Sequence, residues 1–241
     1  MFKKSLLVYS FIFLFLSCAS KKQSIIENDW YAFTKTSSER QTPSKVYEFI
    51  DGMKRVYGDP NFNSASYTVK HTVGMIRMYG DNIGYLMTHK SYKNFELSLE
   101  FRWNMEGNNN QGKNKKNSGV MYNIPVDSPD NIWPKGVQFQ IKDDSTGDFI
   151  FLDSISAKVN GKLVEAGRSV NSFKFIDNEN PYGEWNTILI RSFNGKLLQY
   201  LNGKLVNECV EVSSREGKIS LNYEGSPIDF RNIQITTIRK E

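Results

Sequence analysis

Strict alternation of apolar and polar residues over nine positions is the feature that most constrains the fold of this chain. The apolar positions are Phe95, Leu97, Leu99, Phe101 and Trp103, and the polar positions between them are Glu96, Ser98, Glu100 and Arg102. Successive side chains of a β-strand point to opposite faces, so a period of two predicts a strand with one buried and one solvated face. The same pattern recurs at 218–223, which indicates an all-β chain.

Turn signals support this interpretation. Asn-Gly pairs occupy positions 160–161, 194–195 and 202–203, each near a run of β-forming residues. Asn-Gly favours two-residue hairpin turns, because both residues accept a positive φ. Short strands separated by frequent turns predict a β-sandwich, and residues 30–241 suffice for one such domain.

The segment before residue 60 is ambiguous. Helical spacing relates Val46, Phe49, Ile50, Met53 and Val56, and Pro43 could begin a helix. Against a helix, Asp51-Gly52 is a hairpin signal, and GMKRVYGD at 52–59 returns as GMIRMYGD at 74–81. We therefore expect two successive hairpin-like units.

The N-terminus has the pattern of a signal peptide over residues 1–17. Lys3 and Lys4 precede an apolar run at 6–16 that is too short to span a bilayer. The residues FLSC that end at Cys18 resemble a bacterial lipobox, which makes Cys18 the expected lipid attachment residue; the alternative is a plain secretory signal with a chance cysteine. Residues 18–29 are expected to tether a domain at 30–241. The prediction is a bacterial cell-envelope lipoprotein, on the periplasmic face or the cell surface, held to the membrane by its lipid anchor only.

Charge and cysteine content exclude several functions. The formal charge of +5 falls to +3 once Lys3 and Lys4 are removed, because 29 basic residues then face 26 acidic ones. This excess is too small and too dispersed to predict a nucleic-acid partner. Cys209 is the only cysteine left once Cys18 is lipidated, so we expect a buried thiol and no internal disulfide. No zinc-binding spacing is present, and no cofactor is predicted.

Residues 131–152 read as a strand, a polar turn and a second strand. Val137, Phe139 and Ile141 point to one face, while Gln138, Gln140 and Lys142 point to the other. Amides both donate and accept hydrogen bonds, so this row suits sugar hydroxyls and carbonyls, and Trp133 could add a flat apolar wall. The alternative is the ordinary solvated face of a sandwich sheet.

Six segments in order resemble the 3-keto-disaccharide hydrolase domain family. They are GYLMTHKSYKNFELSLEFRW (84–103), NSGVMYNI (117–124), WPKGVQFQIKDDSTGDF (133–149), GEWNTILI (183–190), LNGKLVNE (201–208) and EGSPIDFRNIQI (224–235). The resemblance implies a concanavalin A-like jelly-roll β-sandwich of two antiparallel sheets. It also implies cleavage of glycosidic bonds in 3-keto-glycosides or 3-keto-disaccharides.

This chain departs from the family pattern at three places. Gln138 stands where the family usually has Glu, and Asn123 where it often has Arg; the repeat between 52 and 81 is additional. Glu to Gln keeps the shape but removes an ionisable group. The alternative function is therefore a non-catalytic carbohydrate-binding lipoprotein.

The implied reaction needs a base near C2, a donor for an enolate oxygen and an acid for the leaving oxygen. The candidate catalytic residues are Glu224 as base or acid, Asp148 as second carboxylate and Lys142 as enolate donor. The candidate substrate-binding residues are Gln138, Gln140, Asn117 and Trp133. Each polar candidate also has a plainly structural interpretation in a turn or on a strand surface. No metal residue is assigned, but a divalent cation on Asp143, Asp144, Asp148 and Asp153 is left open.

Overall fold

The computed structural model describes residues 83–104 and 116–238 throughout, together with strand segments 22–24, 30–34, 47–50, 53–57, 68–72 and 75–79. The predicted signal peptide and Cys18 lie outside the described residues. Within the described part of the chain, no helix has the length and apolar character needed to cross a membrane.

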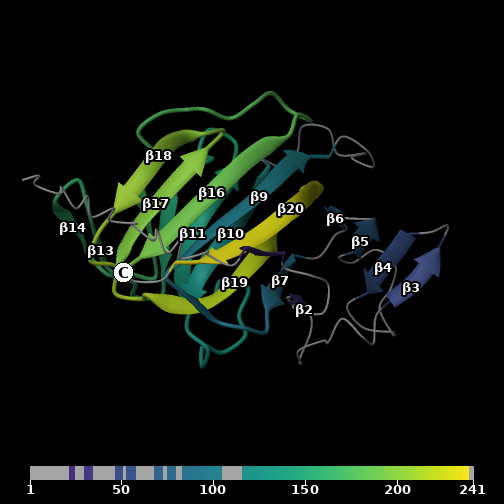
Figure 1. Ribbon diagram of the computed structural model, residues 1–241, viewed down its shortest axis with the longest axis horizontal. Coiled ribbons are helices and arrows are strands. Elements are labelled where there is room, and N and C mark those ends of the chain that lie inside the picture. The colour runs from purple at the N-terminus through teal and green to yellow at the C-terminus, as the bar shows by residue number, and fades with distance from the viewer. Residues whose placement is uncertain are drawn as a thin grey trace, which may run out of the picture.

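Two antiparallel sheets form the domain (Figure 1). Sheet 1 has the order β18 (Lys204–Cys209), β17 (Lys196–Leu201), β16 (Asn186–Phe193), β9 (Phe95–Trp103), β20 (Ile228–Thr237), β6 (Met75–Tyr79), β5 (Thr68–Thr72), β4 (Met53–Tyr57) and β3 (Tyr47–Ile50), with β1 (Lys22–Ser24) paired to β20. Sheet 2 has the order β15 (Ser169–Ser172), β12 (Phe149–Leu152), β11 (Gly136–Lys142), β10 (Asn117–Ile124), β19 (Glu216–Tyr223), β7 (Gly84–Thr88) and β2 (Trp30–Thr34), with β8 (Tyr92–Lys93) paired to β19. A separate hairpin joins β13 (Ala157–Val159) to β14 (Lys162–Val164).

The main core lies between the two sheets. All five apolar residues of β9 are buried and its four polar residues are half-buried, so the predicted two-faced strand is confirmed. Sheet 2 contributes inward-facing residues from β10, β11, β12 and β19, among them Tyr122, Phe139 and Phe151. Strands that are distant in sequence, such as β9 and β20, are neighbours in sheet 1. The predicted all-β jelly-roll sandwich is confirmed.

Local turn chemistry explains the hairpins. Asn194 and Asn202 have φ values of 49° and 50°, and the glycine after each is also positive, at 80° and 79°. Both residues of each pair are therefore left-handed, as a two-residue hairpin turn with Asn-Gly requires. The segment before residue 60 forms the paired strands β3 and β4 and not a helix. With the following pair, β5 and β6, it makes the two expected hairpin-like units.

The face of sheet 2 turned away from the main core holds a second apolar cluster. Its members are Tyr31, Tyr85, Met87, Met121, Ile124, Ile150 and Leu152. A solvated sheet face has no such cluster, so this face must be covered over part of its area. The polar residues between these apolar ones form the candidate site.

Candidate functional site

Strand register sets nine residues of sheet 2, seven of them polar, in three parallel rows across β11, β10 and β19. Lys142 lies opposite Asn117, and the pairing of Ser118 with Tyr223 brings Glu224 level with Asn117. The second row is Gln140, Gly119 and Asn222, and the third is Gln138, Met121 and Ser220. Alternate residues of a strand share a face, so all nine positions lie on one side of the sheet.

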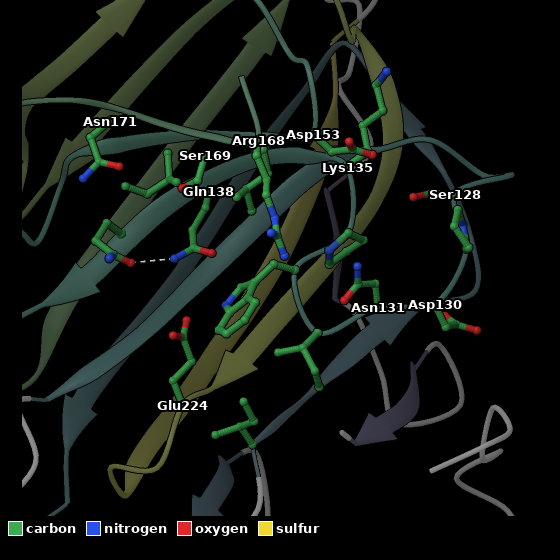
Figure 2. Close-up of a pocket in the computed structure, with 18 of the residues that line it drawn as sticks. Ser128, Asp130, Asn131, Lys135, Gln138, Asp153, Arg168, Ser169, Asn171 and Glu224 are labelled. Atoms are coloured by element: carbon green, nitrogen blue, oxygen red, sulfur yellow. Dashed lines mark hydrogen bonds between the residues drawn. The ribbon is translucent and has the colours of Figure 1, made fainter. Parts of the chain in front are cut away.

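A pocket of about 930 Å³ opens over this face. Its wall is the segment 128–135, which joins β10 to β11, and β12 and β15 supply Ile150, Leu152, Ser169 and Asn171. In Figure 2 the side chains of Glu224, Gln138 and Arg168 extend toward the same space from different parts of the chain. The pocket thus brings together residues that are up to 141 positions apart, from Ile83 to Glu224.

Asp130 fixes the wall segment against the sheet. Its Oδ1 accepts hydrogen bonds from the hydroxyls of Tyr85 at 2.8 Å and Tyr31 at 3.3 Å. Both tyrosine rings are buried in the apolar cluster of this face. These two hydrogen bonds to the Asp130 carboxylate hold the wall segment in place. Because they need no ligand, the wall is preformed.

Glu224 is the carboxylate in this pocket that best suits proton transfer. Asn117 Nδ2 donates a hydrogen bond to Glu224 Oε2 at 2.5 Å. The other carboxylate oxygen, Glu224 Oε1, is buried and accepts no hydrogen bond of good geometry from the described residues. Burial raises the pKa of Glu224 above its ordinary value, although a contact from the Trp133 side chain and the charge of Lys142 act in the opposite direction. A carboxyl whose pKa is shifted toward neutrality serves as a general acid or base.

The two glutamines of β11 are not an ordinary solvated strand face. Gln138 is 3% exposed and Gln140 is 8% exposed, yet both line the pocket. Gln138 Nε2 donates to Gln140 Oε1 at 2.5 Å, which is the dashed line in Figure 2. Buried amides that are already hydrogen-bonded hold fixed positions, as residues that orient a ligand must.

Five of the predicted residues line the pocket, one contacts it and one lies elsewhere. Glu224, Lys142, Gln138, Gln140 and Trp133 line it. Asn117 reaches it through its hydrogen bond to Glu224. Asp148 is not among the lining residues: it is 2% exposed, and its Oδ1 accepts a 2.9 Å hydrogen bond from the backbone N–H of Lys174. Asp148 therefore holds two loops together, and burial raises the pKa of its carboxyl.

The aspartates around β11 do not converge. Among the described residues, no group of three His, Cys, Asp or Glu side chains is placed to hold a metal ion. Asp143 instead forms an ion pair with Lys116 at 2.8 Å. A bound divalent cation stays an open alternative.

The predicted buried thiol of Cys209 is confirmed. Burial raises the pKa of this thiol to about 12.

Several site residues were not predicted from the sequence. Arg168, just before β15, and Asn171, on β15, line the pocket. Ser220 and Asn222 lie beside the glutamines, as the register of β19 requires. The alternation over 218–223 shows that residues 220 and 222 are polar positions of a strand. The sequence does not show which side chains they contact, because that depends on how distant strands pair.

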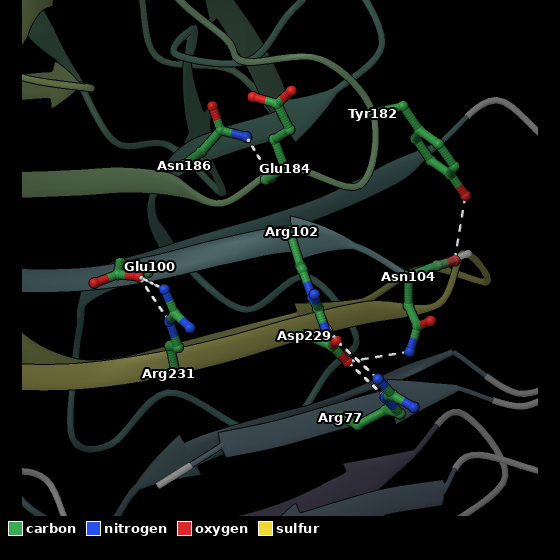
Figure 3. A network of polar contacts seen from close by, with 9 residues as sticks. All are labelled: Arg77, Glu100, Arg102, Asn104, Tyr182, Glu184, Asn186, Asp229 and Arg231. Carbon is green, nitrogen blue, oxygen red and sulfur yellow. Dashed lines mark hydrogen bonds and ion pairs between the residues drawn. The ribbon is translucent and has the colours of Figure 1, made fainter. Parts of the chain in front are cut away.

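Sheet 1 carries a second polar network, on its outer face (Figure 3). Asp229 is fully buried and accepts hydrogen bonds from Arg77 at 2.8 Å and Arg102 at 3.0 Å, and from Asn104 at 3.2 Å. Arg231 pairs with Glu100 at 2.6 Å. This network joins neighbouring strands of one sheet, so we assign it a structural role.

The fold and family of the chain follow from comparison with known proteins. Two crystal structures from Parabacteroides distasonis ATCC 8503, each provisionally assigned as a glycosyl hydrolase, superpose with a TM-score of 0.50. One is 24% identical and covers 74% of this chain and 93% of its own; the other is 19% identical and covers 88% and 89%. The comparison with curated proteins gave no match. Residues 28–236 match the model of the 3-keto-alpha-glucoside-1,2-lyase-like domain. The chain therefore belongs to this 3-keto-disaccharide hydrolase family, which supports a glycoside-processing function.

Proposed function

We propose that this protein cleaves the glycosidic bond of a 3-keto-glucoside by elimination across C1 and C2. The observation that carries the proposal is Glu224, a partly buried carboxyl with a raised pKa, held by Asn117 in a pocket walled by Trp133. The family assignment supports this substrate class.

The chemistry follows from the ketone. A carbonyl at C3 acidifies the proton on C2, so a carboxylate base can remove it. The electron pair left on C2 is delocalised onto the C3 oxygen as an enolate. When the enolate collapses, it expels the C1 oxygen with the bonding pair, and that oxygen takes up a proton from water. The product is a C1–C2 unsaturated 3-keto sugar, and addition of water to it gives net hydrolysis.

The pocket residues fit these steps. Glu224 lines the pocket, so its carboxylate can receive the C2 proton. Lys142 lies across Asn117 from Glu224, where its ammonium group can stabilise the enolate oxygen. Of the six charged residues that line the pocket, Lys135, Lys142 and Arg168 are basic and Asp130, Asp153 and Glu224 are acidic. A balanced charge suits an uncharged sugar.

The same geometry argues against an ordinary glycosidase. That reaction needs two carboxyl groups flanking C1. The second predicted carboxylate, Asp148, is buried in a loop contact, and Asp130 is held by the hydroxyls of Tyr31 and Tyr85. The remaining acidic lining residue, Asp153, is exposed and so lacks the burial that raises the pKa of Glu224. Elimination from a 3-keto sugar requires one base, which Glu224 provides.

We propose that the protein acts at the bacterial cell envelope as a lipoprotein attached through Cys18. The support is the N-terminal sequence pattern alone. Metabolic labelling with a fatty acid analogue tests it: the wild-type chain should incorporate label, and Cys18→Ala should not. Label in the Cys18→Ala variant would contradict lipidation at this residue.

The activity is tested by NMR on the mature chain of residues 18–241 with methyl 3-keto-α-glucoside. We expect release of methanol together with a C1–C2 unsaturated sugar or 3-keto-glucose, and no reaction with methyl α-glucoside, which lacks the ketone. Perturbed resonances of an intact 3-keto-glucoside would instead indicate the non-catalytic binding module. No change with either sugar would contradict both functions.

A further inference from the structure

The floor of the pocket changes character between its two ends. One end holds the carboxylate of Glu224, whereas β12 contributes the apolar side chains of Ile150 and Leu152. Strand register places Ile150 beside Asn171, and Leu152 beside Ser169, on the edge strand β15. Away from Glu224, the floor is therefore an apolar strip with a polar strand along its outer side.

The polar groups at this outer side are available to a ligand. Arg168, Ser169 and Asn171 line the pocket and are exposed. Across the part of the chain that the structure describes, their side chains make no hydrogen bond or ion pair. In Figure 2 the side chain of Arg168 extends into the pocket, and Asn171 lies on the far side of Ser169 from it. A guanidinium group donates hydrogen bonds, while an amide and a hydroxyl both donate and accept, so together they suit the hydroxyl groups of a sugar.

This outer side is too far from Glu224 for one hexose to contact both. Four strand spacings separate β15 from β19, which is about 19 Å between backbones. Along the strands, Asn171 is level with Gln138 and Glu224 is level with Lys142, an offset of four residues of β11, or about 13 Å. A hexose with its C2 at Glu224 therefore ends before Asn171, whereas a group joined to that hexose can reach it.

The C1 substituent is the part of the substrate that points toward the apolar strip. C1 and C3 flank C2 on opposite sides in the sugar ring. The proposed function places the C3 oxygen at Lys142, so the C1 oxygen is directed away from Lys142. In that direction the pocket continues along β11 to Gln138, and then over Ile150 to the edge strand.

We propose that this part of the pocket is a leaving-group subsite, which binds a second sugar ring joined to C1 of the reacting sugar. Its residues are Ile150, Leu152, Arg168, Ser169 and Asn171. The apolar strip packs against C–H groups of the second ring, and Arg168 and Asn171 determine specificity by binding its hydroxyl groups. The inference rests on the proposed function, because that function places the reacting ring at Glu224 and Lys142.

The first experiment compares two substrates that share the reacting ring and differ at C1. They are 3-keto-trehalose, which releases glucose, and methyl 3-keto-α-glucoside, which releases methanol. Arg168→Met and Asn171→Leu remove the polar groups of two exposed side chains, so the fold should be kept. We expect each variant to lower the ratio of kcat/KM for the disaccharide to that for the methyl glycoside roughly three- to tenfold, the usual effect of a lost hydrogen bond. An unchanged ratio in both variants would overturn the inference.

Two comparisons test whether the effect is specific. Arg191→Met removes another partly exposed arginine, on β16 of sheet 1, and should leave the ratio at the wild-type value. Phenyl 3-keto-α-glucoside has a flat leaving group with no hydroxyl, so its kcat/KM should fall less than that of the disaccharide in Arg168→Met and Asn171→Leu. Equal losses for the phenyl glycoside and the disaccharide would show that these residues do not recognise hydroxyl groups, which would overturn the inference.

A binding measurement separates the failure of the subsite from the failure of the proposed function. It uses Glu224→Gln in the mature chain of residues 18–241, with ¹³C-labelled methyl groups of Ile and Leu, because this variant should bind without cleavage. 3-Keto-trehalose should shift the methyl signals of Ile150 and Leu152 more than methyl 3-keto-α-glucoside does. Equal shifts, or none, would overturn the subsite even if the wild-type protein cleaves both sugars. The expected shifts in a protein whose wild-type form cleaves neither sugar would refute the proposed function and leave the subsite standing.

Discussion

Asn117 Nδ2 lies 2.5 Å from Glu224 Oε2, across two neighbouring strands whose contacting residues are 107 positions apart in the chain. The other oxygen of each group, Asn117 Oδ1 and Glu224 Oε1, is buried and has no hydrogen-bond partner among the described residues. When Glu224 takes up a proton, rotation of the Asn117 amide would let its Oδ1 accept that proton in a hydrogen bond. The pair can therefore satisfy both protonation states of a general base.

Replacing Glu224 by Gln should remove the base and keep the shape. We expect kcat for 3-keto-glucoside cleavage to fall roughly 10²- to 10⁴-fold, the usual contribution of a positioned general base. Glu216→Gln is a matched control at the opposite end of β19, where the side chain is largely exposed. Equal turnover of the two variants would show that Glu224 is not the base.

The same substitution should change stability in a pH-dependent way. The folded pKa of Glu224 is raised by burial, so the native state binds the proton more tightly than the unfolded chain does. Stability then falls as the pH rises from the ordinary glutamate pKa to the raised one. Glu224→Gln should therefore melt at a higher temperature than the wild-type protein near neutral pH. The difference should shrink below about pH 4, where both states are protonated. A constant difference across this range would contradict the raised pKa.

Asn117 should act on the reaction through Glu224. Asn117→Ala removes the hydrogen bond that stabilises the carboxylate, so the pKa of Glu224 should rise further. The acidic limb of the pH profile of kcat/KM should move to higher pH. A loss of activity with an unmoved limb would indicate a purely structural role.

Asp229 should contribute to stability and not to the pocket. Its fully buried carboxylate compensates Arg77 and Arg102, and removal of one partner of a buried ion pair typically costs about 3–5 kcal/mol. Asp229→Asn should lower the free energy of unfolding in urea accordingly, with KM unchanged in the folded protein. The matched comparison is Glu100→Gln, whose pair with Arg231 is partly exposed and should contribute about 1 kcal/mol or less. Similar losses for the two variants would contradict the burial argument.

The sequence was sufficient for the fold because the evidence for it is local. Alternation over 95–103 and the Asn-Gly turns depend on neighbouring residues, and both proved correct. The site was only partly predictable, because it depends on register between distant strands. Nothing local shows that Glu224 lies level with Asn117. Asp148 resembled a site carboxylate because it follows the glutamine strand, but the turn directs it to the backbone of Lys174.

The most direct test of elimination uses methyl 3-keto-α-glucoside that carries deuterium at C2. The account predicts that cleavage proceeds with a primary kinetic isotope effect and that the deuterium is lost from the sugar to solvent, because Glu224 removes the C2 hydrogen before the C1–O bond breaks. Cleavage at an unchanged rate, with the label retained at C2 in the product, would show direct displacement at C1 and contradict the account.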